Sequence, residues 1–415
     1  MPLQIYTAEE GGDEGLGRVD LPGLQTMKVL TMPSSIIPQS MKTLLKPILV
    51  TKDQKLKELV RRLEGQKAAA VDTESNSLYA YRERVCLIQF SIPGGDYLVD
   101  PLALEDISTL GVVFANPGIE KVFHAAEYDL LTLKRDFRFE FANLFDTMLA
   151  ARILGWEKIG LGNMLEAEFG VSLEKKFQKA NWGKRPLPRA MLNYASLDTH
   201  YLINLRDILF EELVRTERWP LALEDFTRLS QISGNGPTPQ PTDIWRMNGA
   251  RDLTPQQATI LKLLAEYRQG KAEKMDKPLF KVIDDKTLLA IAAAQPASYQ
   301  ELGTVPGMTD SQVKRHGKAA LAAVRKGTQE EPSHPPRKLR LDAEYSARVE
   351  ALREWRKKTA RRMGVESDVV LPRNVMFAVA KKNPSDHAGL AKVMESVPWR
   401  LERFGRKIQA VLADH

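Results

Sequence analysis

Acidic residues stand inside or beside apolar runs at three places along this chain. Asp72 and Glu74 lie in AAAVDTES, Asp129 lies in VFHAAEYDLL, and Asp198 lies in NYASLDTHYL. An ionised carboxylate is costly to bury unless it is paired or bound to a metal ion. A fold that buries these runs must therefore supply the four acids with a cation or with other partners.

The spacing of the acids predicts where they lie on their elements. VDTE is expected at the end of a buried strand, and residues two apart on a strand project from the same face. Asp72 and Glu74 can therefore hold one cation together. Asp129 follows the short apolar segment 121–123 and precedes a helical pattern, so we expect it near a strand-to-helix junction, where α/β proteins place functional residues.

A helix is predicted over 191–205 from its apolar pattern, with Tyr194 and Asp198 one turn apart on one face. Oxygen ligands without Cys or clustered His favour magnesium or manganese over zinc. Two such ions roughly 4 Å apart can stabilise the attacking and leaving oxygens of a phosphoryl displacement. Asp72 would bridge both ions. Taken singly, however, the acid pair on the strand fits chance, Asp129 fits a helix N-cap, and Tyr194 with Asp198 fits a solvated helix face.

Order and context favour the metal site. VDTE, HAAEYD and YASLDTHYL resemble the three exonuclease motifs of the DEDD family, in the subclass with Tyr four residues before the last Asp. LEKKFQKANWGKRPL is similar to a segment typical of ribonuclease D, although Ala180 and Asn181 replace the Ser-Asp often found there. The resemblance covers about 46–226. It implies a 3'-5' exonuclease in which four carboxylates hold two divalent cations, Mg²⁺ or Mn²⁺, and a tyrosine orients the attacking water: Asp72, Glu74, Asp129, Asp198 and Tyr194.

The same resemblance suggests substrate contacts, each with an alternative. Leu78 resembles a position that wedges between terminal bases, and a core leucine is an equally good account. His124 contacts the substrate or the metal shell, or is hydrogen-bonded behind them. Trp182 stacks on a base or packs in the core. Three polar side chains are candidates to grip phosphates: Lys175, Gln178 and Arg185.

The order of elements predicts an α/β domain followed by two helical ones. Strands expected over 48–51, 68–73, 85–92 and 97–99 precede helical patterns that include a long one over 187–215, which suggests a mixed sheet flanked by helices, as in the ribonuclease H-like fold. VPGMTDSQVKRHG resembles the HRDC domain, and blocks of this unit match later blocks, which indicates duplication. The predicted parts are an extended or disordered arm, the exonuclease domain, a linker, the first HRDC domain, a second linker and a second HRDC-like domain: 1–40, 41–232, 233–249, 250–327, 328–342 and 343–415.

Charge points to a nucleic-acid partner. The net charge is +7, and the segment from Arg337 to Arg362 alone holds ten basic and four acidic residues. By itself this segment fits a solvated face, but beside a phosphodiesterase site it favours binding of nucleic acid, as do the HRDC-like domains. The sequence contains no membrane-length apolar run and no secretion signal, and the lone Cys86 suits a reducing cytoplasm.

An exonuclease followed by two HRDC-like units resembles ribonuclease D as a whole. The resemblance implies trimming of structured RNA 3' ends, tRNA precursors above all, to nucleoside 5'-monophosphates. No residue is identified that reads a 2'-OH, so the choice of RNA rests on this resemblance. Two alternatives stay open: a DNA 3'-5' exonuclease in repair, and a non-catalytic nucleic-acid-binding scaffold, although such scaffolds generally lose a metal carboxylate.

Overall fold

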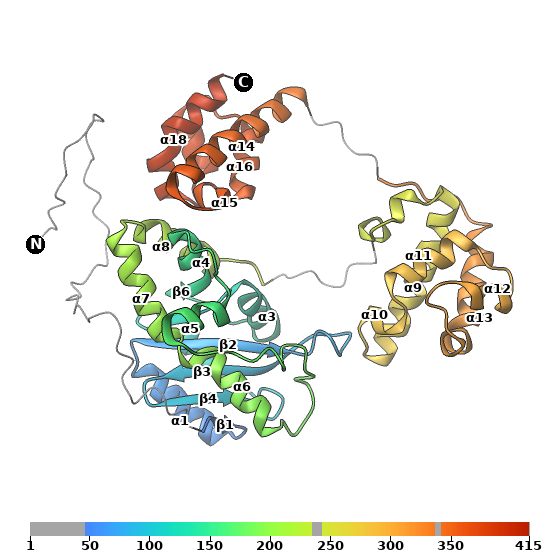
Figure 1. The fold of residues 1–415 in the computed structure, drawn as a ribbon, viewed down its shortest axis with the longest axis horizontal. Coiled ribbons are helices and arrows are strands. Elements are labelled where there is room, and N and C mark those ends of the chain that lie inside the picture. Colours follow the sequence, from blue (N-terminus) through green and yellow to red (C-terminus); the bar gives the residue numbers. More distant parts are fainter. Residues whose placement is uncertain (1–45, 235–242, 337–341, 415) are drawn as a thin grey trace, which may run out of the picture. The chain divides into compact units, whose positions relative to one another are not determined.

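The computed structural model describes residues 46–234, 243–336 and 342–414, which form an α/β domain and two helical domains (Figure 1). The predicted arm 1–40 and parts of both predicted linkers lie outside these ranges. Within them, no helix has the length and apolarity that a membrane crossing requires.

A six-stranded mixed sheet forms the centre of the α/β domain, in the order β1-β4-β3-β2-β5-β6. β3 is antiparallel to both of its neighbours, while the other pairs are parallel. The sheet contains all four expected strands, and β5 at the expected strand-to-helix junction before Asp129. It also contains β6, which the sequence did not indicate. The strands are β1 (Ile48–Val50), β2 (Ala68–Ser75), β3 (Val85–Ile92), β4 (Gly95–Val99), β5 (Glu120–Phe123) and β6 (Leu144–Asp146).

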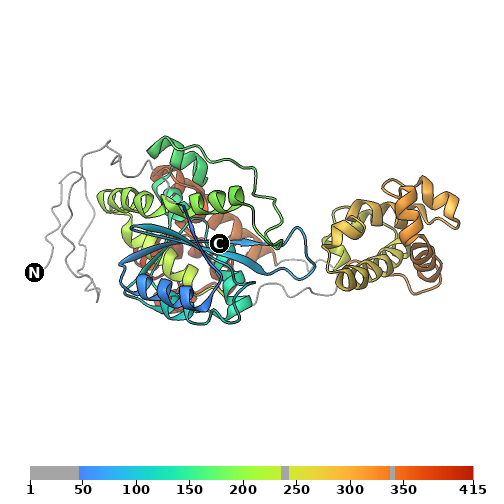
Figure 2. The ribbon, with the colours of Figure 1, turned by 90° about the horizontal axis from the view of Figure 1, so that it is seen from below.

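Helices cover both faces of this sheet (Figures 1 and 2). One apolar cluster gathers around Phe90 and Phe114 and the other around Phe145 and Phe226, so the predicted fold class is confirmed. The predicted helix over 187–215 is two helices that meet at Tyr201. The helices are α1 (Asp53–Glu64), α2 (Leu110–Ala115), α3 (Glu127–Phe137), α4 (Thr147–Leu154), α5 (Leu161–Phe169), α6 (Arg189–His200), α7 (Leu202–Arg215) and α8 (Trp219–Ser230).

Each helical domain has its own apolar core and the same order of long and short helices, as duplication predicts. The first begins with two short 3-10 turns, η2 (Ile244–Arg246) and η3 (Ala250–Asp252). Its helices are α9 (Pro255–Met275), α10 (Leu279–Val282), α11 (Asp285–Ala294), α12 (Tyr299–Thr304) and α13 (Asp310–Gly327). The second contains α14 (Ala343–Met363), α15 (Ser367–Val370), α16 (Arg373–Lys382), α17 (His387–Val393) and α18 (Pro398–Ala413).

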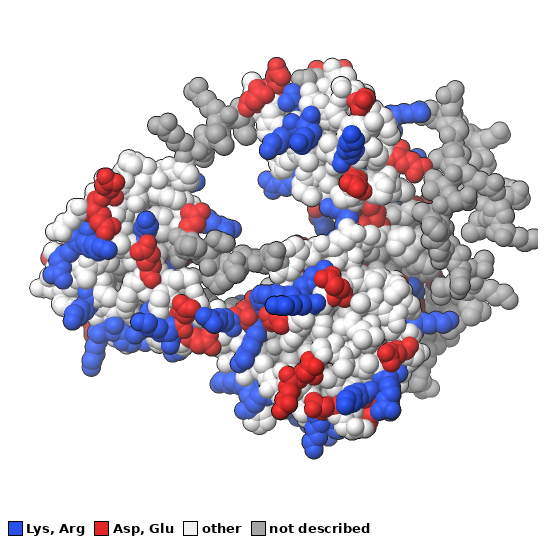
Figure 3. Space-filling view, turned by 180° about the vertical axis from the view of Figure 1, so that it is seen from behind, with Lys and Arg blue, Asp and Glu red and all other residues white. Residues whose placement is uncertain are grey.

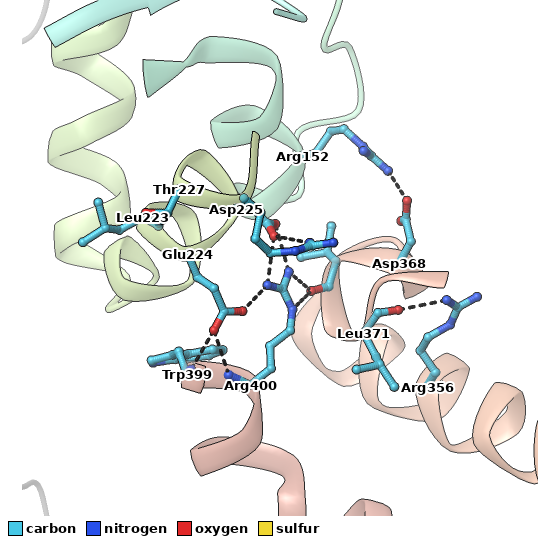
Figure 4. A network of polar contacts seen from close by, with 12 residues as sticks. Arg152, Leu223, Glu224, Asp225, Thr227, Arg356, Asp368, Leu371, Trp399 and Arg400 are labelled. Atoms are coloured by element: carbon cyan, nitrogen blue, oxygen red, sulfur yellow. Dashed lines mark hydrogen bonds and ion pairs between the residues drawn. The ribbon is translucent and has the colours of Figure 1, made fainter. Parts of the chain in front are cut away.

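A buried arginine joins the second helical domain to the α/β domain (Figure 4). Arg400 of α18 is 0 % exposed and forms ion pairs with Glu224 and Asp225 of α8. Its two terminal nitrogens each donate to an Asp225 oxygen at 2.9 Å, and Nη2 also donates to the Val369 carbonyl at 2.8 Å. The Val369 side chain belongs to the apolar cluster around Phe145. The two domains therefore share a core as well as charges.

Part of the basic segment is used inside the protein. Arg348 is buried and donates to the Ala380 carbonyl at 3.0 Å, and Arg356 donates to the Leu371 carbonyl at 2.9 Å. Other basic residues of α14 are exposed, but Arg353 pairs with Glu350 at 3.2 Å and Lys357 with Glu354 at 3.8 Å. Basic and acidic side chains are also interspersed across the face drawn in Figure 3. The formal charge of this segment therefore overstates its free positive surface.

Candidate active site

Two carboxylates project from the end of β2 toward α6. Asp72 pairs with Gln89 of β3, and Glu74 pairs with Leu87 before a bulge interrupts the ladder. Because the two acids are two residues apart on a strand, they share a face. This placement agrees with the expectation from VDTE.

Asp129 lies three residues into α3, just after β5. It is buried and accepts a hydrogen bond from Thr73 Oγ1. The turn before α3 is held by Asp146, at the end of β6, which accepts from the backbone N–H groups of Ala125 and Ala126 at 3.2 and 2.8 Å. Asp146 also caps α4. The unpredicted strand β6 thus positions the second carboxylate motif.

Tyr194 and Asp198 come from α6, which is tied to the sheet by polar contacts beneath it. His200 Nδ1 lies 2.9 Å from Asp96 Oδ2 of β4. Ser91 Oγ donates to Asp96 Oδ1 at 2.6 Å and lies 2.7 Å from Thr199 Oγ1. His200 therefore ties α6 to β4.

Seven of the predicted site residues line one cavity of about 640 Å³. Leu78 and Gln178 line a smaller adjoining cavity, and Leu78 is 38 % exposed. Thr73, Asn163 and Glu166 also face the larger cavity and were not identified from the sequence. The predicted residues in the larger cavity are Asp72, Glu74, His124, Lys175, Gln178, Tyr194 and Asp198.

Burial raises the pKa of all four carboxyl groups. The pKa of Glu74 rises to about 9, and those of Asp129 and Asp198 rise to about 7. The pKa of Asp72 is raised well above 3.8 by burial and then by the charges of the other three acids. Within the described ranges no Lys, Arg or His forms an ion pair with any of the four. The protein concentrates negative charge here without compensating it.

The donor set suits a divalent cation. Carboxylate oxygens are the ligands that hard cations prefer, and a bound cation would offset the repulsion among the acids. In the part of the chain that the structure describes, no three His, Cys, Asp or Glu side chains form a ready-made metal cage. The site therefore offers charge and oxygen ligands rather than a closed coordination sphere.

Tyr194 and His124 are both neutral in this setting. Burial, followed by the charges of Asp198, Glu74 and Asp72, raises the pKa of the Tyr194 phenol, so it stays protonated and can donate a hydrogen bond. Burial lowers the pKa of His124, whose Nδ1 lies 2.9 Å from Thr147 Oγ1. His124 is thus held by a hydrogen bond and also lines the cavity, so features of both predicted roles are present.

Trp182 and Arg185 support the site from behind. Trp182 is 1 % exposed, and its ring centroid lies 6.2 Å from that of Tyr194. Arg185 forms a bidentate ion pair with Asp100 at 2.6 and 2.7 Å and donates to the carbonyls of Trp182 and Cys86 at 2.6 and 2.7 Å. Core packing is therefore the account that fits Trp182. With these donors engaged, Arg185 anchors the loop in this arrangement instead of presenting itself to a phosphate.

The comparisons with known proteins agree with this geometry. The 3'-5' exonuclease family matches residues 47–214, and the HRDC domain family matches 257–324 and 346–412. Ribonuclease D of Gluconacetobacter diazotrophicus is 30 % identical over 265 residues, which cover 63 % of this chain and 67 % of that protein. This chain belongs to the ribonuclease D family. Ribonuclease D of Sphingobium indicum is 29 % identical over 86 % of this chain and 92 % of its own length.

A solved ribonuclease D has the same fold. The structure of Escherichia coli RNase D, described as an exoribonuclease involved in structured RNA processing, covers 89 % of this chain and 100 % of its own, with a TM-score of 0.65 and 25 % identity. The predicted family and enzyme class, a 3'-5' exoribonuclease, are thus confirmed. Ribonuclease D enzymes of the DEDD group use divalent metal ions, and their HRDC domains indicate nucleic-acid contact. The DNA-repair and scaffold alternatives are not favoured.

Proposed function

We propose that this ribonuclease D shortens RNA from its 3' end, using two divalent cations, Mg²⁺ or Mn²⁺, and releasing nucleoside 5'-monophosphates. One observation carries the proposal. Four carboxylates gather at the end of β2, one of them buried and three half-buried, and none has an ion-pair partner among the described residues. The three half-buried ones line one cavity. The proposed ligands are Asp72, Glu74, Asp129 and Asp198.

The acids would hold the cations, and Tyr194 would orient the attacking water. When bound, the cations lower the pKa of a water molecule and neutralise charge that develops on the phosphodiester. Tyr194 keeps its proton and donates a hydrogen bond that aims the attacking water, because a phenol with a raised pKa is a poor base. Asp72 and Glu74, on a rigid central strand, hold their oxygens in a fixed relation to each other.

The cavity rim supplies the proposed substrate contacts. Lys175 and Gln178 are exposed and border the cavity, where they can reach phosphates. Leu78, at the adjoining cavity, is placed to pack against the terminal base. The exposed basic residues of α14 and both HRDC domains would hold the rest of the RNA. We take structured RNA, including tRNA precursors, as the substrate, in line with the Escherichia coli relative.

The test uses a 5'-labelled RNA hairpin with a single-stranded 3' tail and the DNA molecule of the same sequence. With Mg²⁺ or Mn²⁺, we expect stepwise loss of the RNA tail, release of 5'-monophosphates and much slower loss of the DNA tail. A tRNA precursor with a short 3' extension should be shortened in the same way. Internal cuts, 3'-monophosphate products or equal activity in EDTA would contradict the proposal.

A further inference from the structure

Gln89 stands beside the active site with its amide group unused. It lies in the middle of β3 and is the direct cross-strand partner of Asp72. The side chain is 0 % exposed, and neither Nε2 nor Oε1 has a hydrogen-bond partner among the described residues. Opposite residues of an antiparallel pair point to the same face, so Gln89 and Asp72 lie together beneath α6.

An unpaired buried amide is unfavourable. Leaving its donor and acceptor unsatisfied destabilises the fold relative to a paired group, whereas an apolar side chain of the same shape carries no such cost. The next polar side chain on this face, Ser91, is fully bonded to Asp96 and faces Thr199. The anomaly on this face of β3 is therefore confined to the position next to Asp72.

No side chain among the described residues donates a hydrogen bond to Asp72. The backbone N–H of Thr73 stabilises its ionised form, whereas burial and three neighbouring acids oppose it. An ionised carboxylate accepts up to about four hydrogen or metal bonds. Asp72 could therefore help to hold the cations and still accept a hydrogen bond from a nearby N–H.

We propose that Gln89 is a positioning residue for Asp72, whose amide N–H donates to the Asp72 carboxylate and holds it in the orientation that binds the cation. Directly opposite residues have Cβ atoms roughly 4.5–5.5 Å apart, so rotation of the Gln89 side chain brings Nε2 within reach. Groups that hold a metal ligand in place in this way typically contribute about 10–100-fold to metal affinity. This inference rests on the proposed metal site.

The test measures Mn²⁺ binding to the full chain by calorimetry, together with the melting temperature in EDTA. Gln89→Met keeps the length of the side chain and removes the amide, and Gln89→Leu is a second apolar variant. Both should weaken Mn²⁺ binding by roughly tenfold or more. Both should also melt at or above the wild-type temperature without metal, because the unpaired amide is gone. Excess Mn²⁺ should restore turnover.

Ser91→Ala is the matched control on the same face, because it removes a hydrogen bond that is already made. It should melt at a lower temperature and bind Mn²⁺ within about twofold of the wild type.

The outcomes distinguish a failure of the proposed metal site from a failure of the proposed role of Gln89. A wild-type chain that binds no Mn²⁺ would overturn the proposed function along with this inference. If the wild type binds Mn²⁺ and both Gln89 variants bind it equally well, only the role of Gln89 fails. Weaker binding that is accompanied by a lower melting temperature in both variants would also overturn it, because Gln89 would then be a structural residue alone.

Discussion

Two groups of buried and half-buried acids in this protein differ in whether a basic side chain pairs with them. On α8, Glu224 and Asp225 receive the guanidinium of Arg400, which is itself wholly buried. Burial raises the pKa of Glu224, and Arg400 offsets part of that rise. At the end of β2 and on α3 and α6, four acids, one buried and three half-buried, have no such partner in the described ranges. The difference shows that this fold can place a basic side chain beside acids that are withdrawn from solvent. Within the described residues, it places none beside the four acids where a metal ion is expected.

The largest expected effect comes from removing a charge from the uncompensated group. Asp72→Asn keeps the shape of the side chain but removes a charge that would help to hold the cations, so turnover should fall on the order of 10³-fold or more. The metal-free protein should melt higher, because the other acids lose a repulsive neighbour. Single-turnover assays and melting in EDTA measure the two effects. Normal turnover in Mg²⁺ would refute the assignment of Asp72.

Removing the cation from the compensated group should have the reverse effect. Arg400→Met leaves Glu224 buried without its ion pair and leaves Asp225 paired with Arg228 alone, which should lower the free energy of unfolding by about 3–5 kcal/mol. Urea unfolding and limited proteolysis of the full chain report this loss.

A matched variant separates charge from packing. Combining Arg400→Met with Glu224→Gln and Asp225→Asn should recover most of the lost stability, because no buried charge is left alone. If the triple variant is as unstable as the single one, the packing of Arg400 matters more than its charge.

A smaller effect is expected from the phenol beside the uncompensated acids. Tyr194→Phe removes one hydrogen-bond donor and keeps the ring that packs near Trp182, so kcat should fall about 10²-fold with little change in melting temperature. Because Tyr194 acts by donating, the remaining activity should keep the pH profile of the wild type. A profile that loses its basic limb would instead show that the phenol acts as a base.

The smallest expected effect is the change in the free energy of unfolding over one pH unit. Asp129 and Asp198 have pKa values of about 7 against 3.8 ordinarily, and Glu74 has about 9 against 4.5. Between about pH 4 and 9 the folded chain therefore binds more protons than the unfolded chain. In EDTA the free energy of unfolding should fall as pH rises, by at most about 1.4 kcal/mol per unit for each titrating group. Saturating Mg²⁺ should remove this decline. Stability that rises with pH in EDTA would contradict the prediction.

Much of the site could be predicted because its residues lie on regular elements with simple periods. Asp72 and Glu74 follow the two-residue period of a strand, and Tyr194 and Asp198 follow the turn of a helix. The same periods indicated β3 and β4. These patterns place side chains relative to their own element. The apolar run that precedes Asp72 indicated that β2 is buried and that the acids lie at its end.

What the sequence could not show are the partners that tertiary packing supplies. The family resemblance suggested substrate contacts for Arg185 and Trp182 in the loop before α6, with core packing as the alternative for Trp182. In the structure Arg185 pairs with Asp100 at a distant strand end, and Trp182 is buried. β6 is three residues long, too short for a pattern, although its Asp146 organises the turn before α3. Gln89 lies in an apolar run, and the sequence did not indicate that it lies opposite Asp72, because that depends on the register between β3 and β2.

The junction at Arg400 also bears on how the protein is made. Translation delivers α8 well before α18, and Arg400 follows Glu224 by 176 residues. A nascent or truncated chain can thus carry every predicted catalytic group while two acids on α8 and the apolar seat of Val369 still face water. Such a chain exposes surface that proteases and chaperones recognise. This surface is therefore covered only after α18 has been synthesised and has docked on α8.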